Sequence, residues 1–216
     1  YQLTGTIDRV DVFEDKAFIL DYKTGNAIVN IKDIYYGDKI QVLLYATALK
    51  NDKNKNLDVV GVGYFPIKNT FIKEENIDTS HLIDGFFASS NSVIESLDIA
   101  VKDACNEGDK VQSNIYNFYK QVKKGGEISF SSKVISEDQL NTLYAYANEL
   151  VKNVLEEIEQ GYIEAKPDTD ACNYCEYACI CNKELVSKTR EQTSKNLNYI
   201  EEVINGVSNT KPTQNS

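Results

Sequence analysis

The sequence predicts an α/β fold with a central mixed β-sheet that is flanked by helices and followed by a C-terminal cysteine-rich segment. The first observation is the order of patterns, which runs strand, strand, helix, strand and then helices, as expected for a sheet covered by helices. The second is the position of the cysteines, because four of the five fall between residues 172 and 181. With 216 residues and 42% hydrophobic content, the chain is long enough for one sizeable core.

The N-terminal third predicts a hairpin, a helix and a third strand. Residues 3–13 alternate and are rich in β-branched side chains, which favours a strand. A short turn then leads into a second strand at 17–22, the expected hairpin partner. Residues 33–50 have the apolar periodicity of a helix. Residues 57–66 predict another strand, which ends at Pro66.

The rest of the chain predicts mainly helices and loops. We expect a helix over 92–105, and loops with a short helix over 107–133. Residues 136–160 predict a long helix, because their apolar spacing is regular and Ser136 can cap the N-terminus. A last helix is expected from about 184 to 204, followed by a disordered tail.

Composition and charge limit the class of protein. No apolar run approaches the roughly 20 residues needed to span a bilayer, and no secretory signal opens the chain, so we expect a cytoplasmic protein with no membrane partner. The formal net charge of −10 lacks the basic footprint usual for nucleic-acid binders. An acidic chain can still act on DNA through a local contact or through a second protein of the same complex.

The chain has no methionine and begins at Tyr1 inside an expected strand, which predicts a fragment of a longer polypeptide.

A carboxylate and an ammonium follow the apolar run of the second strand, where that strand ends. Asp21 and Lys23 are two residues apart, so their side chains point to the same face. If the first two strands pair, Asp8 lies across from Asp21, and two carboxylates in a partly buried place need a positive charge. Magnesium suits such a site, since it binds one or two carboxylates, a backbone carbonyl such as that of Tyr22, waters and a phosphate.

These residues suit the hydrolysis of a phosphodiester bond. A bound metal polarises the phosphate and lowers the pKa of a water ligand, while Lys23 can orient that water and stabilise the transition state. Gln41 and Tyr45 are four residues apart in the expected helix, so they share a face and can position the substrate backbone. Asp21 and Lys23 have a simpler interpretation as a surface ion pair at a strand end. Gln41 and Tyr45 have one as the edge of an ordinary amphipathic helix.

The cysteine-rich segment has the spacing of a metal or cluster site. Cys172, Cys175 and Cys181 form a C-x2-C-x5-C pattern, with Cys179 as an extra thiol. Thiolates this close in sequence can hold zinc or an iron–sulfur cluster, and the spacing does not choose between them. Cys179 can be considered as a fourth ligand, but two cysteines separated by one residue are awkward for a cubane.

Three stretches, GTIDRVD, ILDYKTG and QVLLY, together resemble the PD-(D/E)xK nuclease core of the RecB-like group. The resemblance implies a metal-dependent deoxyribonuclease in which Asp8 is the first metal carboxylate. Asp21 and Lys23 then match the D-x-K pair, and Gln41 and Tyr45 match the QxxxY motif.

With the cysteine pattern, the chain is similar to the C-terminal part of AddB-type components of bacterial ATP-dependent helicase/nucleases. This likeness implies a nuclease core at 1–166, with a family insertion at 67–135. It also implies an iron–sulfur segment at 167–190, and a helix and tail at 191–216.

The same likeness implies cofactors and partners. Cys172, Cys175 and Cys181, with a cysteine upstream of the nuclease core, would bind a 4Fe–4S cluster, which this fragment alone would hold poorly or not at all. Magnesium would serve the active site, and DNA unwound during double-strand-break repair would be the substrate. An AddA-type helicase-nuclease subunit would be the partner, and ATP would be hydrolysed only in the helicase parts of the complex.

Two other assignments share these motifs. A CRISPR-associated adaptation exonuclease has the same core, QxxxY helix and terminal cysteines, but it is usually a small stand-alone protein. A non-catalytic DNA-binding domain can keep the fold, although the intact Asp8, Asp21 and Lys23 argue against it. The basic run KQVKKGG can contact DNA phosphates or form a solvated loop.

Overall fold

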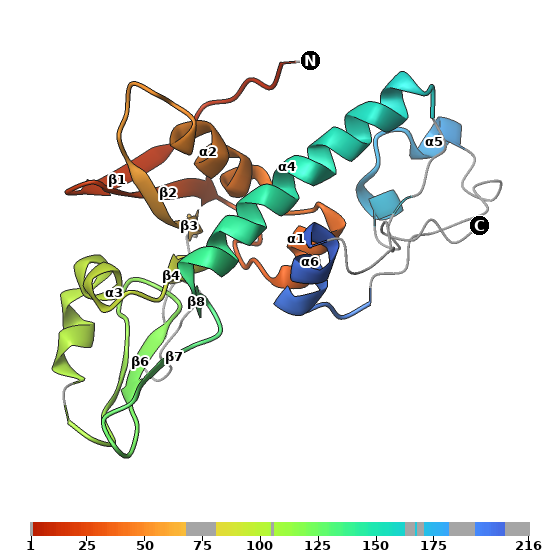
Figure 1. Ribbon diagram of the computed structural model, residues 1–216. Helices are drawn as coiled ribbons and strands as arrows, with labels where there is room; N and C mark the ends of the chain where they lie inside the picture. The colour runs from red at the N-terminus through yellow and green to blue at the C-terminus, as the bar shows by residue number, and fades with distance from the viewer. Residues whose placement is uncertain are drawn as a thin grey trace.

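The central sheet has five strands in the order β1-β2-β3-β4-β8, in a computed structural model that describes residues 2–67, 81–104, 106–162, 167, 171–181 and 193–205 (Figure 1). The strands are β1 (Arg9–Phe13), β2 (Lys16–Lys23), β3 (Asp58–Pro66), β4 (Asp84–Ala88) and β8 (Val134–Ile135). The pairs β1–β2 and β3–β4 are antiparallel, and the pairs β2–β3 and β4–β8 are parallel. The predicted mixed sheet is therefore confirmed.

The predicted hairpin forms, although its first strand is shorter than expected. Alternation predicted a strand over 3–13, but pairing with β2 begins only at Arg9. Residues 2–8 precede β1 and are not part of a strand. Side-chain alternation does not by itself fix where pairing starts, because a strand is stabilised by its cross-strand neighbours.

Strand β2 is buried on both faces. Ala17 and Ile19 join the core beneath the helices, while Phe18 and Leu20 join a second core on the opposite face. Such a continuous apolar run is typical of a strand covered on both sides. A Cβ at Gly61 of β3 would overlap the Phe18 ring, so only glycine leaves room for that side chain. This tight packing fixes the N-terminal half of β2 against β3.

The single helix predicted over 33–50 is wrong, because the chain forms two helices there. The first is α1 (Ile31–Tyr36) and the second is α2 (Gln41–Lys50). Gly37 ends α1 with φ at 84°, in the left-handed region that glycine adopts readily. The apolar periodicity continued across the break, which hid it from the sequence pattern.

The long helix predicted over 136–160 is confirmed as α4 (Glu137–Glu159). The Ser136 hydroxyl accepts from the Gln139 amide, and the Gln139 side chain accepts from the Ser136 amide, which makes a capping box. The first half of α4 packs over α2 and the sheet, and the second half extends toward α5 (Ala178–Cys181) (Figure 1).

The last described helix, α6 (Leu197–Ile204), is shorter than the helix predicted over 184–204. Residues 193–196 are extended, and the part of the prediction before residue 193 lies outside the described residues. Helix α6 packs against α4 and adds the buried Ile200 to the core. The predicted disordered tail also lies outside the described residues.

A second, three-stranded sheet replaces the loops and short helix predicted over 107–133, so that prediction is wrong. Its antiparallel strands are β5 (Lys110–Gln112), β6 (Tyr119–Val122) and β7 (Ile128–Phe130). Strands of three or four residues are too short to show a period of two, which explains the error. Below, these strands are called the small sheet, which lies with α3 (Asn91–Leu97) at one side of the molecule (Figure 1).

The helix predicted over 92–105 is interrupted at Asp98. Helix α3 ends there, and a 3-10 turn covers Ile99–Asp103, while Cys105 lies outside the described residues. The Asp98 carboxylate accepts hydrogen bonds from the Ala100 amide and the Ser113 hydroxyl. Burial alone would raise the pKa of Asp98, but these hydrogen bonds outweigh it and lower the pKa. Asp98 thereby ties α3 to the small sheet.

No helix among the described residues has both the length and the apolar character needed to cross a bilayer.

Candidate active site

The C-terminal end of β2 presents the predicted carboxylates. The β1–β2 register pairs Arg9 with Leu20, so the next position along the hairpin sets Asp8 opposite Asp21. Asp21 is only 4% exposed, whereas Asp8 is exposed rather than partly buried as expected. Asp8 Oδ2 accepts a hydrogen bond of 2.9 Å from the Tyr22 amide. Both carboxylates therefore lie at the C-terminal end of β2.

The buried carboxylate of Asp21 has one oxygen without a hydrogen bond. Lys23 Nζ lies 2.5 Å from Asp21 Oδ2, but the contact lacks hydrogen-bond alignment, and this oxygen has no hydrogen-bond partner among the described residues. A buried oxygen left in this state costs free energy, since it has lost water without a full replacement. The two groups still attract each other as charges, because Coulomb attraction depends on separation rather than on alignment.

The Lys23 side chain connects the end of β2 to helix α2 by a hydrogen bond. Its Nζ donates to Gln41 Oε1 at 2.9 Å, and Gln41 Nε2 donates to Tyr45 Oη at 3.0 Å. Gln41 is the first residue of α2 and Tyr45 is one turn later, so both face the end of β2. Asp21, Lys23, Gln41 and Tyr45 therefore form one continuous row of polar contacts. Below, these four residues, which are candidates for catalysis, are called the catalytic row.

An aromatic ring and a second lysine lie beneath the catalytic row. Tyr64 of β3 pairs with Asp21 in register and is 1% exposed. Lys23 Nζ and Lys39 Nζ lie 5.1 and 5.7 Å from the centre of its ring. Burial, and next the Asp21 charge, raise the pKa of Tyr64, while burial lowers the pKa of the Lys39 ammonium. Sequence analysis missed both residues, because the β2–β3 register brings Tyr64 to the site and the turn between α1 and α2 brings Lys39.

A buried ion pair one strand further on was also missed. Asp84 of β4 pairs with Tyr64 in register and is 3% exposed. Its carboxylate accepts from Lys133 Nζ at 2.8 Å, from Asn117 Nδ2 at 2.7 Å and from the Val29 amide at 2.7 Å. These three partners come from distant parts of the chain, so no local pattern in the sequence indicates the contact.

The same contacts hold the loop that follows Lys23. Lys133 Nζ also donates to the Val29 carbonyl, so both backbone groups of Val29 are bonded to the ion pair. Lys39 Nζ donates to the carbonyls of Asn26 and Ile28 at 2.7 and 2.5 Å. The segment between β2 and α1 is thus fixed at several backbone groups. This arrangement limits how far Lys23 can move.

The carboxylates at the end of β2 fit a magnesium ion. Asp21 offers a buried oxygen that lacks a hydrogen bond, and Asp8 offers an exposed carboxylate at the same strand end. Among the described residues there is no group of three or more His, Cys, Asp or Glu side chains that could hold a metal. Magnesium needs fewer protein ligands than that, because one or two carboxylates and several waters complete its shell.

The cysteine thiols do not form a ligand cluster within the described residues. Cys172 is half-buried, while Cys175, Cys179 and Cys181 are exposed, and none of the four is in a disulfide. Cys179 and Cys181 lie two residues apart on α5, so they point to different sides of that helix. This geometry argues against both thiols serving one cluster, in agreement with the assignment that leaves Cys179 out.

Comparison with known proteins finds one family and a set of relatives. The PD-(D/E)XK nuclease superfamily matches residues 1–182. The ATP-dependent helicase/deoxyribonuclease B subunit of Clostridioides difficile (strain 630) is 27% identical over 223 residues, covering 94% of this chain and 19% of the relative. The protein of the same name from Clostridium acetobutylicum is 32% identical over 194 residues, covering 83% of this chain and 16% of the relative. The chain therefore spans less than a fifth of the length of these relatives.

The family match agrees with the geometry of the site. It covers the sheet, α2, α4 and the cysteine-rich segment, and so includes every residue of the catalytic row. The fold is the mixed sheet with flanking helices that the motifs implied. On this evidence, the chain belongs to the PD-(D/E)XK nuclease superfamily.

Proposed function

We propose that this chain is a magnesium-dependent deoxyribonuclease domain that hydrolyses phosphodiester bonds of unwound DNA. The observation that carries the proposal is the catalytic row, in which a buried carboxylate oxygen without a hydrogen bond lies 2.5 Å from an ammonium group. A cation, a lysine and a glutamine–tyrosine pair at one strand end supply what phosphoryl transfer requires, which is positioning and charge stabilisation.

Each residue of the site has a proposed role. Asp8, Asp21 and the Tyr22 carbonyl would hold Mg²⁺, which when bound polarises a phosphate and lowers the pKa of water. Lys23 orients the attacking water and donates to the phosphate oxygens as their negative charge grows. Gln41 holds the Lys23 ammonium in place, and Tyr45 holds Gln41 and presents its hydroxyl to the DNA backbone. Water adds to phosphorus, the bond to the leaving oxygen breaks, and that oxygen takes up a proton.

The relatives suggest the larger assembly. Their name describes the B subunit of an ATP-dependent helicase/deoxyribonuclease. We propose that this domain works in the cytoplasm with an AddA-type helicase-nuclease subunit during double-strand-break repair, and that helicase parts elsewhere in the assembly hydrolyse ATP. We also propose residues 1–166 as the nuclease core, 167–190 as the cysteine-rich segment and 191–216 as a C-terminal helix, packed on the core through Ile200, with its tail.

The cysteines are proposed to bind a 4Fe–4S cluster in the intact protein. The C-x2-C-x5-C spacing of Cys172, Cys175 and Cys181 and the family relationship support this assignment, with a fourth thiolate supplied from outside these residues. Iron and acid-labile sulfide measured on the intact protein test it. About four of each per protein is the expected result, and zinc in their place would contradict it.

The nuclease proposal is tested by cleavage of labelled single-stranded DNA with and without Mg²⁺. We expect Asp21→Asn and Lys23→Ala each to lose at least about 100-fold in rate, the scale found when a charge-stabilising group is removed. Lys53→Gln, an exposed lysine in the loop before β3, is the matched control and should keep its rate. Equal rates in the wild type and both site variants would refute the proposal. Mg²⁺ binding by calorimetry without any cleavage would instead favour a non-catalytic domain.

A further inference from the structure

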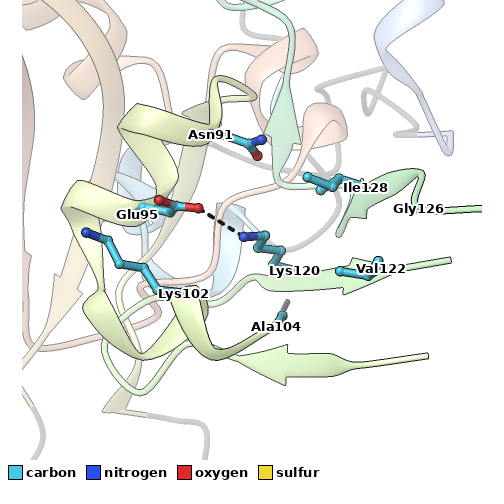
Figure 2. Close-up of a pocket in the computed structure, with 8 residues that line it drawn as sticks. All are labelled: Asn91, Glu95, Lys102, Ala104, Lys120, Val122, Gly126 and Ile128. Carbon is cyan, nitrogen blue, oxygen red and sulfur yellow. Dashed lines mark hydrogen bonds and ion pairs between the residues drawn. The ribbon is translucent and has the colours of Figure 1, made fainter. Parts of the chain in front are cut away.

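An open cavity of about 510 Å³ lies between α3 and the small sheet (Figure 2). This volume falls in the range of about 300–1,000 Å³ that is usual for small-ligand sites. One wall comes from α3, with Asn91 and Glu95, and the opposite wall comes from the small sheet, with Lys120, Val122 and Ile128 (Figure 2). The nuclease chemistry proposed above uses none of these residues.

An ion pair between a buried lysine and a half-buried glutamate joins the two walls of the cavity. Lys120 is 5% exposed, its Nζ lies 3.0 Å from Glu95 Oε1, and the Glu95 side chain is 32% exposed. Replacing an ion pair that has lost much of its contact with water by apolar side chains of similar size is often neutral or stabilising. The pair is therefore weak evidence for a purely structural role. What the pair adds is a hydrogen-bond donor and an acceptor side by side in a space large enough for a ligand.

This donor and acceptor match the edge of a nucleobase. Guanine presents a carbonyl oxygen next to two N–H donors on its pairing edge, while the other DNA bases present one donor group there. The Lys120 ammonium can donate to that oxygen, and the Glu95 carboxylate can accept from the N–H groups. Val122 and Ile128 offer apolar contacts to the faces of the ring, and the Ile128 side chain is 37% exposed. Pockets that hold unstacked bases combine these two kinds of contact.

Lysines next to the cavity suit the phosphates of the same strand. Lys123 and Lys124 stand between Val122 and Gly126, two residues that line the cavity, in the turn that joins β6 to β7. Both glycines of this turn have positive φ values, 86° and 80°, which glycine adopts readily. Residues 106–135 contain five lysines and three acidic residues, although the whole chain has a net charge of −10. The small sheet is therefore a local basic region on an acidic chain.

The segment that joins β5 to β6 of the small sheet is bonded to the start of β4 in the central sheet. Ile83, just before β4, pairs with Tyr116, and Asp84 accepts a hydrogen bond from Asn117. Asp84 is in turn the register partner of Tyr64, which lies beneath the catalytic row. A DNA strand held at the small sheet is thus held by a segment that is hydrogen-bonded to the sheet carrying the proposed nuclease residues.

From these observations we infer that the cavity binds a guanine base of single-stranded DNA, with Glu95 and Lys120 contacting the base and Lys123 and Lys124 contacting adjacent phosphates. The inference rests on the proposed function, because it adds a second contact for the same DNA substrate. It gives the nuclease a preference for strands that contain guanine near the cleavage site.

The test is fluorescence anisotropy of the protein with labelled thymine oligonucleotides in EDTA, which prevents cleavage. We expect an oligonucleotide with one central guanine to bind at least about fivefold more tightly than the all-thymine strand, the lower end of discrimination for a paired base contact. Glu95→Gln keeps one acceptor oxygen for Lys120 but removes the second, which would accept from guanine. The ratio of the affinities for the two oligonucleotides should therefore fall to about one. Lys124→Gln should weaken both oligonucleotides equally, and Lys53→Gln should change neither.

Equal binding of the two oligonucleotides by the wild type would overturn the inference. A guanine preference that survives in Glu95→Gln, with circular dichroism showing a folded variant, would also overturn it by locating the preference elsewhere. Neither result depends on cleavage. Active Mg²⁺-dependent cleavage without guanine preference therefore removes only this inference, while guanine preference without cleavage removes only the proposed nuclease activity.

Discussion

Breaking the buried ion pair between Asp84 and Lys133 should destabilise the protein strongly. In Lys133→Met, Asp84 stays 3% exposed and keeps the Val29 amide and Asn117, but it loses the cation that balances its charge. Removing one partner of a buried pair costs about 3–5 kcal/mol, mostly because a charge is left uncompensated. For a chain of this size, that loss corresponds to a fall in melting temperature of about 6–20 °C.

Urea unfolding followed by circular dichroism measures the change. Lys152→Met is the matched control, because Lys152 on α4 is 64% exposed and lies 3.9 Å from Glu149 and Glu156. Exposed pairs of this kind contribute about 0–1 kcal/mol. The double variant Asp84→Asn/Lys133→Met has no charge at either of these two positions and should recover much of the stability lost in Lys133→Met. A loss below about 1 kcal/mol in Lys133→Met, or no recovery in the double variant, would refute the reasoning.

Three further predictions concern the metal, the sheet and alkaline pH. In thermal unfolding scans, Mg²⁺ should stabilise the wild type by about 2.7 kcal/mol at 100 times its Kd, and should leave Asp21→Asn unchanged. Gly85→Ala should cost at least about 1–3 kcal/mol in urea unfolding, because the new Cβ would overlap the Val62 carbonyl oxygen; Gly25→Ala, with nothing within 4 Å, is its control. Burial raises the pKa of Tyr116 from 10.0 to about 12, so its contribution to stability is complete below pH 10 and is lost as the pH rises toward 12. Tyr116→Phe should show a shallower decline over that window in pH-dependent unfolding, and an identical slope would contradict this assignment.

The parts of the fold that depend on nearby residues could be predicted from the sequence. The strand β2 is a continuous apolar run, and α4 has regular spacing and a capping box, so both are encoded locally. Asp21 and Lys23 are two residues apart at the end of that strand, and strand geometry alone puts them on one face. Their contact with Gln41 required only the next helix along the chain.

The parts that depend on strand register could not be predicted in this way. Tyr64 and Asp84 reach the site because β3 pairs with β2 and β4 pairs with β3, and register is not visible in one sequence. Lys133 is 49 residues from Asp84 and follows a region in which loops were expected. The region 67–135, expected to be an insertion, supplies two strands of the central sheet, β4 and β8. A separable module cannot be recognised, or ruled out, until the pairing of its strands is known.

The break at Gly37 has a consequence for how the loop before α2 can vary. Successive residues of an α-helix are rotated by about 100° around the helix axis. In one unbroken helix, a residue added before Gln41 would therefore rotate the Gln41 side chain away from Lys23. With the break, the angle of α2 is set instead by its own buried Val42, Leu43 and Ala46. A change in the length of this connection that leaves Lys39 bonded to the Asn26 and Ile28 carbonyls would therefore keep Gln41 facing Lys23.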